Sequence, residues 1–206
     1  MKTDHSLHRA GKRPDWSRVS RRRWNIWQRV AGNSGGVLTV GNTFTVIGFC
    51  LVLIGLTMVA ADMNWWGLIL IGGGRICDLL DGWLADRTQT KSPLGEMLDT
   101  TADKLETAAA LIVLTLLGVL PWPAALLVFV PQASVGLWAL SWWLRGKQPH
   151  PSRLGKLGMA AVWVGLGFFI AQAASDIDVF AVIGYVSCAV SAVLTLSALR
   201  RYIRDI

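Results

Sequence analysis

The chain has 206 residues, of which 53% are hydrophobic and only 16% are charged, and its formal net charge is +7. A soluble domain carries about 25% charged residues. The composition therefore excludes an ordinary soluble protein and predicts an all-α, polytopic membrane protein. The positive charge does not indicate a nucleic-acid partner, because it follows the membrane topology described below.

The first segment, residues 1–36, is basic and polar and precedes every long apolar run. Within it, DWSRVSRRRWNIWQRVAG mixes five arginines with three tryptophans. On a helix, Trp16 and Trp27 fall near one face and arginines occupy much of the rest. This pattern predicts an amphipathic helix in the cytoplasmic interface, attracted by anionic membrane lipids; a solvated basic tail is the alternative. We expect a membrane domain to follow, over residues 37–206.

Six segments are candidates for membrane-spanning helices, which need about 20 mostly apolar residues. They cover residues 41–61, 65–86, 93–120, 122–144, 154–174 and 178–199. The loops after the first, third and fifth spans contain no Lys or Arg, whereas the other loops and both termini are basic. By the positive-inside rule, both termini and the basic loops face the cytoplasm. The expected location is a bacterial inner membrane.

The second and third spans carry an unusual group of acids within DLLDGWLADRTQTKSPLGEMLDTTADK, residues 78–104. Asp78 and Asp81 are three residues apart, and Asp99 and Asp103 are four apart, so each pair shares one helical face. The spans run antiparallel from a short cytoplasmic loop, so the pairs are expected at comparable depth. Intramembrane acids are costly and mark function. All-oxygen ligands favour Mg²⁺, Mn²⁺ or Ca²⁺, so the sequence predicts a divalent-metal site.

Two other interpretations of these acids stay open. They could pair with Arg75 and Lys104 only to hold helices together, although this would leave most of the negative charge unmatched. They could also line a cation transporter, where polar or broken helices are expected along a full path. The fourth and sixth spans offer almost no polar groups for such a path.

The same residues resemble the signature of the CDP-alcohol phosphatidyltransferase family. That signature reads D-x-x-D-G-x-x-A-R, then eight residues, then G-x-x-x-D-x-x-x-D. Seven of its eight fixed positions match, at Asp78, Asp81, Gly82, Ala85, Gly95, Asp99 and Asp103. The signature's arginine is replaced by Asp86, and Arg87 follows. In addition, GNTFT at the start of the first span resembles the family's P-N-x-x-T, with Gly41 in place of proline.

The resemblance implies a phospholipid-synthesising enzyme. Such an enzyme transfers a phosphatidyl group from CDP-diacylglycerol to the hydroxyl of a small polar alcohol and releases CMP. The resemblance further implies two Mg²⁺ or Mn²⁺ ions, with Asp103 also the general base, and a homodimer is common in the family. The implied metal ligands are Asp78, Asp81, Asp99 and Asp103. The implied nucleotide and diphosphate contacts are Asn42, Thr45, Gly82, Ala85, Arg87 and Gly95. An inactive relative that binds metal is the remaining alternative.

The acceptor alcohol is best sought in RGKQPHPSRLGK, before the fifth span. Arg153 and Lys156 lie near the cytoplasmic mouth, where two cations would suit an acceptor that carries a phosphate. SRLGK resembles the corresponding segment of phosphatidylglycerophosphate synthases, which favours glycerol 3-phosphate. Inositol phosphate, inositol, serine and phosphatidylglycerol stay open, as does a purely topological reason for the two cations.

Overall fold

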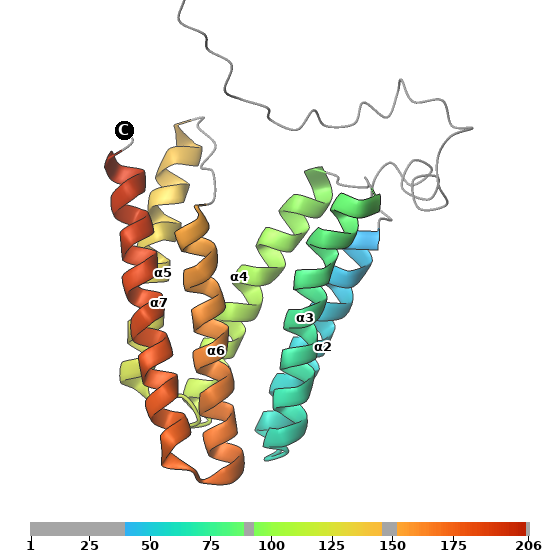
Figure 1. Cartoon of the computed structure of the whole chain (residues 1–206), viewed down its shortest axis with the longest axis vertical. Coiled ribbons are helices and arrows are strands. Elements are labelled where there is room, and N and C mark those ends of the chain that lie inside the picture. Colours follow the sequence, from blue (N-terminus) through green and yellow to red (C-terminus); the bar gives the residue numbers. More distant parts are fainter. Residues whose placement is uncertain (1–39, 89–92, 146–151, 205–206) are drawn as a thin grey trace, which may run out of the picture. The chain divides into compact units, whose positions relative to one another are not determined.

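The computed structural model describes residues 40–88, 93–145 and 152–204, and every regular element within these ranges is an α-helix (Figure 1). The expected interfacial helix of residues 1–36 lies outside the described residues. The six helices are α2 (Val40–Ala60), α3 (Asn64–Thr88), α4 (Pro93–Leu116), α5 (Trp122–Leu144), α6 (Arg153–Ser175) and α7 (Asp178–Arg204).

Each predicted span coincides with one of these helices, which confirms the all-α prediction. Two helix ends differ most from the prediction: α7 continues to Arg204 rather than ending at residue 199, and α4 ends at Leu116 rather than at residue 120. Gly118 adopts a left-handed conformation with φ of 74°, and the backbone N–H of Leu120 donates to the carbonyl of Leu114 at 2.9 Å. Glycine commonly ends helices in this way because it lacks a Cβ.

Four helices in the described part of the chain are long and apolar enough to cross a membrane: α2, α5, α6 and α7. The protein is therefore an integral membrane protein. Helices α3 and α4 have the length of a span, but they carry the acids that lower their hydropathy. The predicted six spans thus include two helices, α3 and α4, that are not among these four, so the count of six stays a proposal.

The chain divides into two compact units, which are described separately. The first contains Met1–Gly48 and Ile76–Ala102, and so takes in the start of α2, the end of α3 and the start of α4. The second contains Phe49–Arg75 and Asp103–Ile206. The buried apolar core belongs to the second unit; among its fully buried side chains are Val52, Leu114, Leu166 and Phe169.

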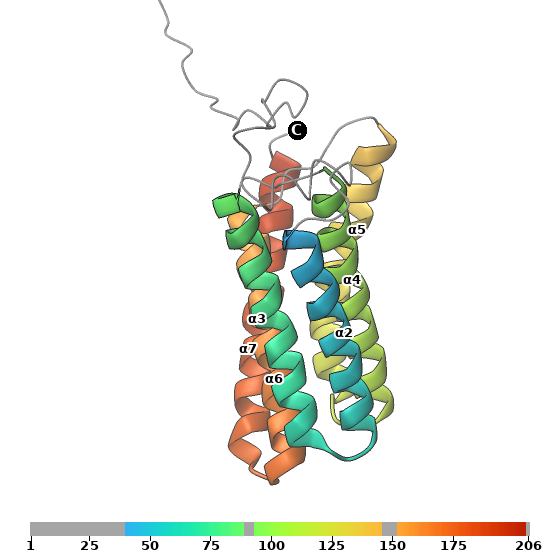
Figure 2. The same ribbon diagram turned by 90° about the vertical axis from the view of Figure 1, so that its right-hand side faces the viewer.

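In the second unit, α6 and α7 form an antiparallel hairpin, and α5 also lies beside α7 (Figures 1 and 2). Glycines allow the close approach: a Cβ added to Gly165 would lie 2.9 Å from Cys188 Sγ, and one added to Gly184 would lie 2.9 Å from the Phe169 ring. Large apolar side chains such as Val193 face outward instead. Small residues at helix contacts are typical of membrane proteins. The buried residues of α7 are Gly184, Cys188, Ser191, Ala192, Thr195 and Ala198.

The second unit's parts of α2 and α3 also meet through glycines. A Cβ on Gly55 would lie 2.9 Å from the carbonyl oxygen of Gly67, and a Cβ on Gly67 would lie 2.8 Å from that of Gly55. At the start of α3, the Asn64 amide donates to the Ala173 carbonyl of α6 at 3.1 Å. These contacts fix the first half of α3 in the second unit, with Arg75 at its end.

We expect Gly67→Ala to destabilise the protein, because the new methyl would meet backbone that cannot move out of its way. Overpacking of this kind costs about 1–3 kcal/mol. The matched control is Gly72→Ala on the same helix, where an added Cβ meets nothing within 4 Å and helix propensity improves by about 1 kcal/mol. Thermal unfolding in detergent should give a lower Tm for the first variant only. Equal Tm values for both variants would contradict the tight contact.

Candidate functional site

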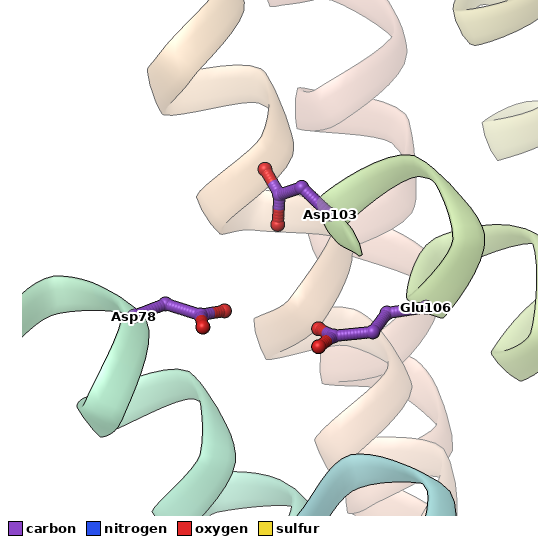
Figure 3. A group of neighbouring side chains, drawn as sticks. All are labelled: Asp78, Asp103 and Glu106. Carbon is purple, nitrogen blue, oxygen red and sulfur yellow. The ribbon is translucent and has the colours of Figure 1, made fainter. Parts of the chain in front are cut away.

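The described site centres on Arg75, whose guanidinium binds two carboxylates of α4. Its Nη2 lies 2.7 Å from Asp103 Oδ1, and its Nη1 donates to Glu106 Oε2 at 2.7 Å. Both acids lie on α4 (Figure 3). Because they are three residues apart, they share one face of that helix. All three residues belong to the second unit. One cation therefore faces two anions, and the group retains a net negative charge.

The face of the Arg75 guanidinium is covered by an aromatic ring from a third helix. Arg75 Cζ lies 4.6 Å from the ring centroid of Trp163 on α6. Trp163 is buried and the Arg75 side chain is 21% exposed, so this cation–π contact is partly desolvated and is worth about 0.5–2 kcal/mol. Trp163 of α6 thus contacts the face of the guanidinium, and the two acids of α4 contact its nitrogens.

The two carboxylates differ strongly in their exposure. The Glu106 side chain is 1% exposed, whereas that of Asp103 is 33% exposed. Within Asp103, Oδ1 is itself buried, so the exposed surface lies on the remaining side-chain atoms, which include the second oxygen. Asp103 thus has one oxygen beside Arg75 and a side chain that is still partly exposed, whereas Glu106 is enclosed.

The structure places the other predicted acids on the expected helices. Asp78 and Asp81 lie on α3 and Asp99 lies on α4. The side chain of Asp78, drawn in Figure 3, is partly buried and belongs to the first unit. The side chains of Asp81 and Asp99 lie outside the described part of the structure. Their helical backbone preserves the spacing that puts each Asp pair on one face.

The predicted nucleotide contacts lie on three helices. Thr45 on α2 is buried, with 3% of its surface exposed. The others have described helical backbone but no described side chain: Asn42 on α2, Gly82, Ala85 and Arg87 on α3, and Gly95 on α4.

The predicted acceptor residues lie in the first turn and second turn of α6. Arg153 and Lys156 are both exposed. The helix start is fixed by Ser152, whose Oγ accepts a hydrogen bond from Gly155 N at 3.1 Å. The Ser152 N–H in turn donates to Tyr202 Oη of α7 at 2.6 Å. The two cations therefore project from an anchored helix end, where a phosphate would be favoured.

Sequence reasoning did not select Glu106 or Trp163. Glu106 follows Asp103 by three residues, so the same spacing rule that paired the other acids could have found it. Trp163 gave no local signal, since it lies in an apolar stretch of α6. From the sequence, Arg75 was considered only as a partner of the acids that holds helices together. The ion pair of Arg75 with Asp103 agrees with that interpretation for Arg75. Lys104 is exposed.

Comparison with known proteins identifies relatives over most of the chain. The family model for CDP-alcohol phosphatidyltransferases matches residues 38–196. A Mycobacterium tuberculosis protein named “Putative cardiolipin synthase” is 30% identical over 131 residues, covering 63% of this chain and 63% of that protein. Another, named “Probable phosphatidylglycerophosphate synthase”, is 32% identical over 132 residues, covering 64% and 63%.

A plant relative is similar over a longer stretch. The Arabidopsis thaliana “CDP-diacylglycerol--glycerol-3-phosphate 3-phosphatidyltransferase 1, chloroplastic/mitochondrial” is 31% identical over 163 residues, covering 69% of this chain and 54% of that protein. The chain thus spans less than two thirds of the length of each of these three relatives.

Proposed function

Because the chain belongs to the CDP-alcohol phosphatidyltransferase family, we propose that it transfers a phosphatidyl group from CDP-diacylglycerol to a small polar alcohol in phospholipid synthesis. The acceptor oxygen forms a bond to the phosphorus attached to diacylglycerol, the bond from that phosphorus to CMP breaks, and CMP leaves. The observation that carries this proposal is the match of the family model across the acid-bearing helices α3 and α4.

The proposed metal site uses the four aspartates of the signature. Their carboxylates form an all-oxygen donor set, which fits Mg²⁺ or Mn²⁺, and the family is divalent-metal dependent. We assign the ligands as Asp78, Asp81, Asp99 and Asp103, and we propose that they hold two ions. Bound ions would neutralise the diphosphate of the substrate and the leaving CMP.

Asp103 is the proposed general base. Its accessible oxygen takes the proton of the acceptor hydroxyl as that hydroxyl attacks phosphorus. Its other oxygen, Oδ1, faces Arg75 at 2.7 Å, so the carboxylate is held while it acts. This division between a held oxygen and a reacting oxygen supports the assignment.

The substrate's nucleotide and diphosphate are assigned to the remaining signature residues. Gly82, Ala85 and Gly95 leave room for the nucleotide, with Asn42 and Thr45 nearby. Asp86 stands where the signature has arginine, so we infer that Arg87 supplies the diphosphate contact. Arg87 is the second-last residue of α3, and a side chain at a helix end can reorient more readily than one in its middle.

Glycerol 3-phosphate is the proposed acceptor. Two observations support it: Arg153 and Lys156 are exposed at the anchored start of α6, and the plant relative's name specifies glycerol 3-phosphate. A second candidate is phosphatidylglycerol, favoured by the relative named for cardiolipin synthesis. Both acceptors carry a phosphate and a free glycerol hydroxyl, so the same cations would serve either one.

The proposed topology has six spans, with residues 1–36 in the cytoplasmic interface and residues 37–206 as the membrane domain. Both termini and the site face the cytoplasm, because the basic loops lie on that side. An external signal from a reporter fused after Ile206 would contradict this orientation. We also extend the family's homodimer to this chain, which the mass of the detergent-solubilised protein would test.

Release of CMP by the purified protein tests the function. With CDP-diacylglycerol and Mg²⁺, we expect glycerol 3-phosphate to support the fastest release, and phosphatidylglycerol, inositol phosphate, inositol and serine to support little. Mass spectrometry of the lipid product identifies the acceptor used.

In the same assay, Arg87→Ala should raise the apparent KM for CDP-diacylglycerol by roughly tenfold or more, because the variant loses one charge-assisted contact to the diphosphate.

The outcomes separate the candidates. If phosphatidylglycerol alone supports CMP release, the acceptor is phosphatidylglycerol rather than glycerol 3-phosphate. No release with any acceptor would contradict phosphatidyl transfer itself.

A further inference from the structure

Glu106 presents an energetic problem that the signature residues do not explain. Its carboxylate is 1% exposed, and it is the only acidic or basic residue that is buried in the described part of the chain. A buried charge is strongly unfavourable unless it is paired and hydrogen-bonded. Its hydrogen bond from Arg75 at 2.7 Å supplies such a pairing. The question is what this buried pair does for the protein.

The geometry of Arg75 connects Glu106 to the proposed base. A guanidinium is a rigid planar fork, so fixing one of its nitrogens restricts the position of the others. Here Nη1 donates a hydrogen bond to Glu106 Oε2, and Nη2 forms an ion pair with Asp103 Oδ1, each at 2.7 Å. Trp163 covers the face of the plane at 4.6 Å. Glu106 and Trp163 therefore fix the guanidinium, and the guanidinium fixes one oxygen of Asp103.

We propose that Glu106 and Arg75 are positioning residues that hold the Asp103 carboxylate with Oδ1 turned inward and its other oxygen presented to the acceptor hydroxyl. Neither residue occupies a fixed position of the family signature. The proposal rests on the proposed function, because it assigns Asp103 as the base. The competing explanation is an ion pair that only joins α3 to α4.

The decisive variant replaces the pair by apolar residues, Arg75→Met with Glu106→Leu. Exchanging a buried ion pair for apolar side chains is often neutral for stability. Asp103 also loses Arg75 as a partner, but it is 33% exposed, so the double variant should stay folded, with its Tm lowered only by the loss of the Arg75–Asp103 ion pair. If the pair positions Asp103, kcat for CMP release should fall about tenfold or more, while the apparent KM for CDP-diacylglycerol stays within about twofold, because nucleotide binding does not use the pair. Wild-type kcat in the folded double variant would overturn the proposal.

A conservative variant keeps the test valid if the double variant does not fold. Arg75→Lys retains the charge but has a single nitrogen, which cannot bind both acids in the fork geometry. It should fold, with kcat lowered and KM unchanged. The matched control is Thr115→Val, an isosteric change nine residues after Glu106 on α4, which should leave both constants unchanged. Wild-type kcat in a folded Arg75→Lys variant would also overturn the proposal.

A spectroscopic readout separates failure of this inference from failure of the proposed function. In protein labelled with 5-fluorotryptophan, the ¹⁹F signal of Trp163, assigned by its loss in Trp163→Phe, reports the guanidinium stacked on its ring. Arg75→Lys should shift this signal and Thr115→Val should not. An unchanged signal in Arg75→Lys would refute the stacked arrangement whether or not the protein is active. Absence of CMP release from the wild type, by contrast, would refute the function.

Discussion

Removal of divalent metal should abolish CMP release while leaving the protein folded. Asp78, Asp81, Asp99 and Asp103 would then repel one another and the substrate diphosphate without compensation. The loss of several kcal/mol of charge stabilisation corresponds to a rate reduction on the order of a thousandfold or more. The measurement is CMP release after treatment with excess EDTA, followed by readdition of Mg²⁺ or Mn²⁺.

Two controls make the metal experiment specific. EDTA saturated beforehand with Mg²⁺ should have no effect. Mn²⁺ added to the apoprotein should raise its Tm, because a ligand that binds only the folded state stabilises it by about 2.7 kcal/mol at a hundred times its Kd. Asp99→Asn should weaken that stabilisation. Full turnover in excess EDTA would show that the acids do not form a metal site.

The Asp103→Asn variant should lose most of its turnover and keep most of its nucleotide affinity. Asparagine has nearly the same shape but cannot accept the acceptor's proton, and removal of a general base costs about 10²–10⁴ in rate. Asp78→Asn is the matched comparison, since Asp78 is assigned to metal binding alone. We expect Asp78→Asn to lose turnover together with metal-dependent binding of CDP. Both quantities are accessible by CMP release and by calorimetric titration with CDP.

The structure adds a reason why the two variants should differ. Asp103 Oδ1 faces Arg75, and Arg75 keeps its bond to Glu106 when Asp103 is neutralised. The Asp103→Asn variant should therefore retain its Tm to within a few degrees. If this variant releases CMP at a near-normal rate, the base has been assigned to the wrong residue.

The sequence by itself determined the helices and the location of the acids on them. The predicted fourth span, residues 122–144, has the bounds of α5, Trp122–Leu144. An apolar stretch of this length forms a helix in lipid, because its backbone N–H and C=O groups must be hydrogen-bonded within the same segment. The spacing of Asp99 and Asp103 on α4 likewise follows from helix geometry alone. The end of α4 was placed four residues too late because the effect of Gly118 depends on its φ, not on hydropathy.

The tertiary structure alone decided the partners of Arg75. Helical spacing states which residues share a face, but it cannot state which helix that face meets. Arg75 lies on α3, its two carboxylate partners lie on α4, and its aromatic partner Trp163 comes from α6. Glu106 was not selected from the sequence, yet packing buries its side chain to 1% exposure. A buried charge is stable only when it is paired with an opposite charge. Which residue supplies that charge depends on how the three helices pack, and no local stretch of sequence contains that information.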